Sequence, residues 1–156
     1  VPPYDRYEIC WGAHTCLMGA VKALKAFGAV PKEKRTPEID GAIARAAEFL
    51  LIHRIFRRSH DPRKVSKPGW LKFGFPLMYQ TDALEILDIL TGLGVRDARM
   101  DDAVRLVMEK QTEDGRWRME NTYANDRLLV PLADAEERDK WITLRAMRAL
   151  RRYGKL

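Results

Sequence analysis

Three stretches of the sequence share one ending, Leu-x-x-x-Gly, at residues 24–28, 90–94 and 150–154. Each stretch closes a segment whose apolar residues recur every three or four positions, which predicts an amphipathic helix. Glycine just past the last periodic residue is a common helix stop. Self-similarity of this kind is typical of repeated helical units. The shared ending therefore predicts an all-α chain built from α/α hairpin repeats.

The same periodicity predicts five helices. Thr36 suits an N-cap, Pro37 the first helical position, and Glu38 the positive end of the helix dipole. The segment 82–93 is apolar around most of its girth, and such a helix is expected to be buried. We therefore expect two layers, with inner helices at about 14–27, 82–93 and 140–153 and outer helices at about 37–56 and 100–111. The connections 57–79 and 112–138 are expected to be irregular.

The length of 156 residues is that of a single domain, 1–156. No apolar run reaches the ~18 residues that a membrane span needs, so none is expected. Two cysteines, Cys10 and Cys16, fit a reduced cytoplasmic protein better than a disulfide scaffold. The chain begins at Val1 rather than at Met, so we expect it to be a fragment of a longer protein.

The formal net charge is +6, and Lys and Arg cluster in residues 53–72 and in the last helix. A basic surface attracts nucleic acid or anionic lipid, or it meets an acidic neighbour, or it is simply a solvated face. The aromatic–basic interleaving of RNA-recognition modules is absent from the sequence. No sequence-specific nucleic-acid partner is therefore expected.

A seven-residue motif follows the helix expected at 100–111. Gln111, Gly115 and Trp117 form the pattern Gln-x-x-x-Gly-x-Trp. It resembles the QW motif of squalene and oxidosqualene cyclases and the related repeat of protein prenyltransferases. Those families fold as α/α toroids, which are rings of helical hairpins. The resemblance implies a partial, half toroid with long aromatic-rich loops, in which these three residues have a structural role.

A second stretch, His14-Thr15-Cys16, is similar to the start of an inner helix in prenyltransferase β subunits, where the His binds zinc. That resemblance would make His14 a zinc ligand. Cys10, His14 and Cys16 could also supply three ligands by themselves, since zinc accepts thiolate and imidazole with an open fourth position. The other interpretation is a His at a helix start beside two buried thiols.

The resemblance leaves catalysis open. Residues 97–102 do not form the Asp-x-Asp-Asp acid of the cyclases, and the full zinc triad of the transferases is absent. The catalytic candidates are Asp82 and His14. Asp82, Glu85 and Asp88 form an acidic stripe, which fits either a cap with ion pairs or a general acid whose pKa an apolar cavity raises.

Two functions remain. The first is an apolar, isoprenoid-like ligand bound in a cavity at the N-termini of the inner helices, in a cyclase- or transferase-like domain. The second is a non-catalytic helical-repeat module for protein interaction with a basic surface. Five helices do not close a ring, so we expect self-association or a missing N-terminal half. The expected ligand-binding residues are Trp11, His14, Trp70, Phe75, Tyr79, Asp82 and Trp141.

Overall fold

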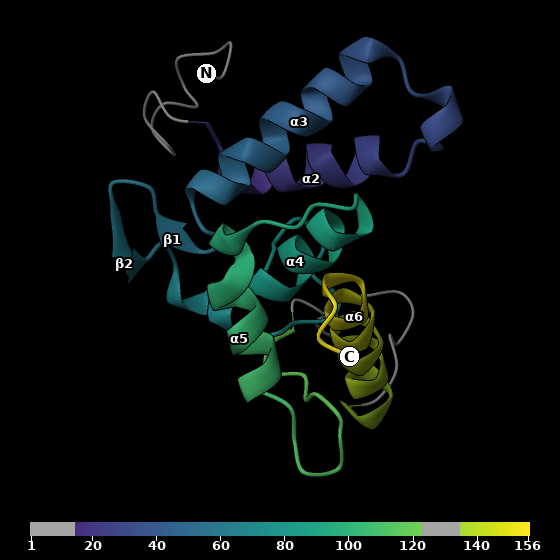
Figure 1. Ribbon diagram of the computed structural model, residues 1–156. Coiled ribbons are helices and arrows are strands. Elements are labelled where there is room, and N and C mark those ends of the chain that lie inside the picture. Colours follow the sequence, from purple (N-terminus) through teal and green to yellow (C-terminus); the bar gives the residue numbers. More distant parts are fainter. Residues whose placement is uncertain (1–14, 123–134) are drawn as a thin grey trace. The chain divides into compact units, whose positions relative to one another are not determined.

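The computed structural model describes residues 15–122 and 135–156, except for the side chains of residues 135–137 (Figure 1). The chain was expected to form one domain, and it divides into two compact units, Val1–Leu50 and Leu51–Leu156. The described elements are predominantly helical, as the sequence predicts, with one two-stranded sheet. Within the described ranges, no helix combines the length and the hydropathy that a bilayer span requires.

The first unit contains the helices α2 (Leu17–Gly28) and α3 (Pro37–Ile52), the latter reaching just past the unit boundary. A short 3₁₀ turn, Lys32–Lys34, lies between them. The start of α3 is as predicted, because the Thr36 hydroxyl accepts a hydrogen bond from the Ile39 amide at 3.4 Å. The apolar face of α2 is buried through Leu17, Met18, Val21 and Leu24.

Both ends of α2 differ from the prediction. The helix begins three residues later than expected, at Leu17, because Cys16 adopts the extended N-cap conformation. Gly28 does not stop the helix, since it is the last helical residue and Ala29 caps the end in a right-handed conformation. The first Leu-x-x-x-Gly stretch therefore lacks the left-handed glycine that the pattern predicts.

The end of α3 and the connection that follows also differ. The helix ends at Ile52 rather than near residue 56, because Arg54 and Ile55 have φ values of +42° and +71°. The connection 57–79, expected to be irregular, contains an antiparallel hairpin of β1 (Arg57–Arg58) and β2 (Asp61–Val65) and a 3₁₀ turn, Pro68–Leu71. The strands are short, charged and joined without glycine, so the usual hairpin signals are missing.

Helix α4 (Ala83–Gly92) is the most buried element described, with every residue from Ala83 to Asp88 buried. This confirms the prediction from its continuous apolar girth. Its end is a Schellman motif, in which Val95 donates to the Leu90 carbonyl and Gly94 to the Thr91 carbonyl. Gly94 has a φ of +80°, which is why glycine is needed there.

Two further helices complete the second unit. After a 3₁₀ turn at Ala98–Met100, α5 (Asp101–Glu109) buries one face and ends two residues before the predicted Gln111. Helix α6 (Ala135–Tyr153) begins five residues earlier than predicted, where Ala, Glu and Arg extend it. It ends in the same Schellman pattern as α4, with Gly154 at a φ of +84° and Lys155 donating to the Leu150 carbonyl.

Helices α4 and α6 pack side by side and run in the same direction (Figure 1). Asp88, near the middle of α4, accepts hydrogen bonds from the guanidinium groups of Arg148 and Arg152. Further along both helices, the Arg152 side chain lies against Gly92. Successive residues of α4 thus meet successive residues of α6, and α5, which contacts both, supplies the returning segment.

The motif at residues 111–117 joins α5 to α6. The Trp117 side chain is fully buried, and its indole N–H donates to the carbonyl of Val107 in the last turn of α5 at 2.6 Å. Its backbone amide donates to the Thr143 hydroxyl of α6 at 3.1 Å. Gly115 turns the chain at a φ of +76°, and the Gln111 amide donates across that turn to the Gly115 carbonyl. Trp117 thus folds back on α5, and its indole satisfies a carbonyl in the last turn of that helix. This contact fits the structural role expected for the motif.

Candidate functional site

The N-terminus of α4 is held to the preceding loop by Asp82. One carboxylate oxygen accepts a hydrogen bond from the Glu85 amide at 2.7 Å, which is the N-cap interaction that the sequence predicts. The other oxygen accepts from the Gly74 amide at 2.8 Å. The side chain is 1% exposed, so both hydrogen bonds are shielded from water. A single carboxyl group therefore fixes the position of residues 73–76 over the start of α4.

Burial raises the pKa of Asp82 from the ordinary 3.8 to about 6. Desolvation of the charged form is the main cause, and the negative charge of Glu85 acts in the same direction. The two backbone N–H groups and the positive charge of Arg145 oppose the rise in pKa. The carboxyl group thus titrates near neutral pH, as the general-acid interpretation of the acidic stripe requires.

Asp88, the last member of that stripe, behaves differently. It accepts hydrogen bonds from Arg148 and Arg152. The hydrogen bond to Asp88, together with the negative charge of that carboxylate, raises the pKa of Arg148 above its usual value. Its position is that of a structural ion pair between α4 and α6. The cap-and-ion-pair interpretation therefore describes the contacts of Asp88 fully, whereas Asp82 combines a cap with a raised pKa.

The loop over Asp82 carries an aromatic side chain to α6. Phe75 stacks on Trp141, with ring centroids 5.7 Å apart and planes inclined by 18°. The loop is held from its other side, because the Phe75 amide donates to the Asn121 carbonyl at 3.2 Å. The ammonium group of Lys140 lies 5.9 Å from the centroid of the Trp141 ring. Trp141 remains 42% exposed, so one part of the stacked pair is open to solvent.

The other expected ligand-binding aromatics lie apart from this pair. Trp70 is buried in the 3₁₀ turn Pro68–Leu71, and the Lys67 ammonium lies 5.8 Å from its ring centroid. Tyr79 is 58% exposed. Trp11 and His14 lie outside the described residues. The structure therefore brings together Phe75, Asp82 and Trp141 from the expected set.

The expected zinc ligands are only partly described. The Cys16 thiol accepts a hydrogen bond from the Gly19 amide at 3.4 Å and caps α2. Cys10 and His14 lie outside the described residues. Over the described ranges, no three His, Cys, Asp or Glu side chains are grouped so that they could hold a metal ion. The part of the site that can be described is thus the carboxyl–aromatic cluster of Phe75, Asp82 and Trp141.

Two polar side chains next to this cluster were not expected from the sequence. The Thr81 hydroxyl and one terminal nitrogen of Arg145 are buried and have no hydrogen-bond partner in the described part of the chain. Arg145 follows Trp141 by four residues on α6, so helical spacing places both on one face. That spacing is a signal that could have identified Arg145. No local pattern points to the roles of Gly74 and Asn121, which come from chain segments far apart.

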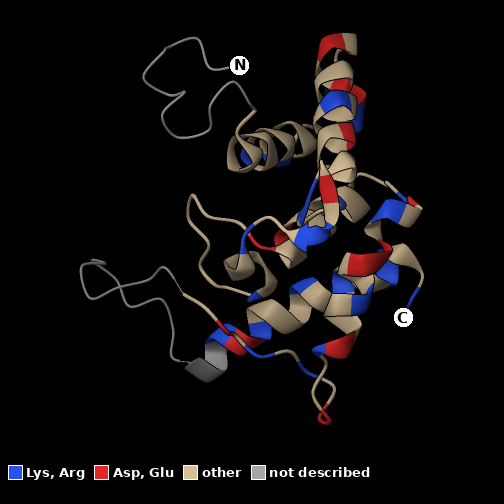
Figure 2. Ribbon diagram, turned by 90° about the vertical axis from the view of Figure 1, so that its left-hand side faces the viewer, with Lys and Arg blue, Asp and Glu red and all other residues tan. Residues whose placement is uncertain are grey.

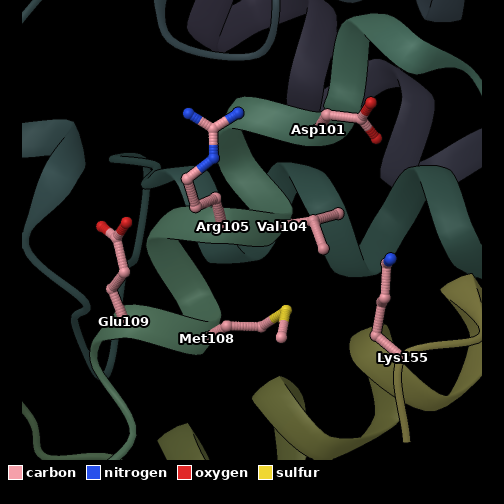
Figure 3. A pocket seen from close by; sticks show the side chains of 6 residues that line it. All are labelled: Asp101, Val104, Arg105, Met108, Glu109 and Lys155. Atoms are coloured by element: carbon pink, nitrogen blue, oxygen red, sulfur yellow. The ribbon is translucent and has the colours of Figure 1, made fainter.

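An open pocket lies elsewhere, along α5. Asp101, Val104, Arg105, Met108 and Glu109 line it from the helix, and Lys155 lines it from the C-terminal segment (Figure 3). Figure 3 shows Met108 pointing toward the segment that carries Lys155. Four of the six lining side chains are charged, and none belongs to the expected ligand-binding set. This pocket therefore does not provide the apolar cavity that the sequence predicts.

Comparisons of the chain with protein-family models, with curated proteins and with solved structures gave no match.

Proposed function

We propose that the chain is an α/α-toroid-like module that binds an apolar, isoprenoid-like ligand beside the stacked pair of Phe75 and Trp141. The stacked pair is the observation that carries the proposal, because it joins α6 to the loop that Asp82 holds through the Gly74 amide. Stacked aromatic rings offer a large, rigid apolar surface. Their faces also stabilise positive charge, which is the property that makes such rings suitable for isoprenoid chemistry.

The surface around Trp141 supports an apolar ligand. Trp141, Leu144 and Met147 are spaced three apart on α6, so they form one stripe, and they are 42%, 51% and 49% exposed. Met78 and Tyr79, which follow Phe75 in the loop, are also exposed. Contiguous exposed apolar side chains are uncommon on monomeric proteins and mark binding surfaces.

The toroid part of the proposal is supported by the arrangement of α4, α5 and α6. Parallel neighbours joined through an antiparallel helix are what a layered array of hairpins requires. The Schellman ends of α4 and α6 at Gly94 and Gly154 are alike, which fits two copies of one unit. Helix α2 fits this repeat less well, because it ends at Gly28 with a right-handed cap at Ala29.

The proposal is tested by titrating the protein with farnesol and recording the indole N–H signals of the four tryptophans by NMR. We expect the Trp141 signal, assigned with Trp141→Phe, to shift in a saturable manner. The Trp117 signal is the internal control, because that ring is fully buried and cannot meet a ligand at the surface. Leu144→Ser should weaken binding, whereas Met108→Ser, an equally exposed apolar position on α5, should not. Equal shifts at Trp117 and Trp141 would contradict the proposed site.

A second candidate function is a non-catalytic helical-repeat module for protein interaction. The exposed cations of residues 53–72 favour it, since they offer a surface to an acidic partner. This function predicts that farnesol leaves all four indole signals unchanged. It also predicts that polyglutamate binds the protein and that binding weakens as salt is added.

A further inference from the structure

The net charge of the chain resides in one segment. Residues 53–72 contain seven Lys and Arg and one acidic residue, Asp61. The whole chain contains 28 Lys and Arg and 22 Asp and Glu, so the remaining 136 residues carry 21 of each. The excess of +6 is therefore confined to a segment of 20 residues, which is centred on the β1–β2 hairpin.

The hairpin presents these cations on both of its faces. Arg57 and Arg58 are neighbours on β1, and Arg63 and Lys64 are neighbours on β2. Figure 2 colours the Lys and Arg positions of the ribbon blue. Successive side chains of a regular strand point to opposite faces, so β2 places Arg63 and Lys64 on opposite sides of the ribbon. The pairing register is irregular between Arg57 and Arg58, and of these two only Arg58 is exposed. The side chains of Arg63 and Lys64 are 90% and 66% exposed. Asp61, which pairs with both, is the single acidic group of the segment.

The hairpin is attached firmly at its base. Arg57 forms an ion pair with Asp102 of α5 at 3.1 Å, and the Ser66 hydroxyl donates to the Arg57 carbonyl at 2.7 Å. The chain enters the hairpin through Arg54 and Ile55, whose positive φ values are costly for residues other than glycine. Ile55 is fully buried, and its packing offsets that cost. The ribbon is thus held in a fixed direction.

We propose that the β1–β2 hairpin binds the phosphate backbone of duplex DNA, without sequence specificity, by entering the major groove. A two-stranded ribbon fits the major groove of B-form DNA, and phosphates line both walls of that groove. Cations on both faces of the ribbon match two charged walls. A flat anionic membrane would contact one face only, and the deep, narrow major groove of duplex RNA excludes a ribbon.

The lack of exposed large apolar side chains in residues 53–72 also favours DNA over an acidic protein as the partner of the hairpin. Protein interfaces are centred on buried aromatic or aliphatic anchors. None of the exposed large apolar side chains of the described residues falls within 53–72, where Phe56 and Trp70 are buried. Arginine forms bidentate hydrogen bonds with phosphate, and four of the seven cations are Arg. The surface thus offers charge without anchors, as non-specific phosphate binding requires.

The test measures binding of a fluorescein-labelled duplex DNA of mixed sequence by anisotropy over a series of salt concentrations. The variant carries Arg58→Glu and Lys64→Glu, one change on each strand. Its matched control carries Arg116→Glu and Arg151→Glu, two exposed cations outside the segment, so that both proteins have the same net charge. Circular dichroism establishes that both variants are folded.

We expect the hairpin variant to lose about tenfold or more in affinity, and its plot of log affinity against log salt to flatten by about two, one unit for each lost phosphate contact. The control should stay within about twofold of the original protein, since non-specific DNA binding depends on local phosphate contacts. Equal losses in the two variants would overturn the proposal. So would stronger hairpin-dependent binding to polyglutamate or to phosphatidylserine vesicles than to the duplex, since these outcomes identify an acidic protein or a membrane.

Discussion

Single side chains decide how the loops of the second unit meet its helices. Trp117 and Asp82 are both fully or almost fully buried. Asp82 accepts from the backbone amides of Gly74 and Glu85, and Trp117 donates to the Val107 carbonyl and to the Thr143 hydroxyl. Buried polar groups are costly unless they are hydrogen-bonded, so both residues are fixed by the partners they satisfy. Their substitution should therefore change the free energy of unfolding through the loss of buried volume and of specific hydrogen bonds, which can be measured separately.

Replacing Trp117 tests the first of these residues. Trp117→Ala should lower the free energy of unfolding by about 3–5 kcal/mol, because it empties a fully buried site. Trp117→His or Trp117→Phe separates volume from hydrogen bonding, and Phe should leave the Val107 carbonyl unsatisfied at a cost of about 1–3 kcal/mol. Urea denaturation provides the measurement. A loss below about 1 kcal/mol in Trp117→Ala would show that the residue is not part of the core.

Asp82 should make stability depend on pH. Its folded pKa of about 6 lies above the ordinary 3.8, so the folded chain holds this proton more tightly than the unfolded chain. The stabilising contribution of the proton is complete below about pH 4 and is lost as the pH rises through 6. The free energy of unfolding of the original protein relative to that of Asp82→Asn should fall by about 2 kcal/mol from pH 4 to pH 7. Parallel pH profiles of the two proteins would contradict this assignment.

At the scale of the elements, local sequence signals predicted the presence of each helix better than the residues at which it begins and ends. The N-caps at Thr36 and Asp82 and the glycine ends at Gly94 and Gly154 were predictable, because each depends on residues within one turn. The hairpin was not predictable, since its strands are short and charged. The same limit applies to the site: the Asp82 cap is local, whereas the stacking of Phe75 on Trp141 joins segments 66 residues apart.

The glycines of the shared ending offer a matched comparison. Gly94→Ala should destabilise the chain by about 1 kcal/mol, because a side chain at a φ of +80° is strained even though the space around it is open. Gly28→Ala should be neutral or stabilising by up to about 1 kcal/mol, since Gly28 is helical and alanine favours a helix. Thermal denaturation of the two variants gives the sign of each change in stability. Equal destabilisation would show that the two glycines end their helices in the same way.

At the scale of the whole molecule, the two compact units differ in how much they bury. The described core of the first unit contains Leu17, Met18, Val21, Leu24, Ala47 and Leu50. A unit of this size buries a smaller fraction of its surface than a larger one does. The second unit contains α4, which is buried on all sides, and most of the buried side chains.

Hydrogen exchange should reveal this difference. The backbone amides of α4 are expected to exchange only through global unfolding, whereas those of α2 should exchange faster through opening of the first unit. Exchange followed by mass spectrometry or NMR would report protection for each helix. Equal protection of α2 and α4 would mean that the two units unfold together.

The hydrogen bond between Asp82 and Gly74 has an optical consequence. Gly74 precedes Phe75, whose ring lies on the indole of Trp141. One hydrogen bond, one peptide bond and one ring contact thus connect a titrating carboxyl group to a chromophore. Protonation of Asp82 changes the electric field around that indole. It also changes the hydrogen bond by which Asp82 holds the loop. The emission of the protein should therefore report the acid–base state of Asp82 with a midpoint near pH 6, and Trp141→Phe or Asp82→Asn should each abolish the response. The chain thus carries its own fluorescent indicator for the group that holds its loop in place.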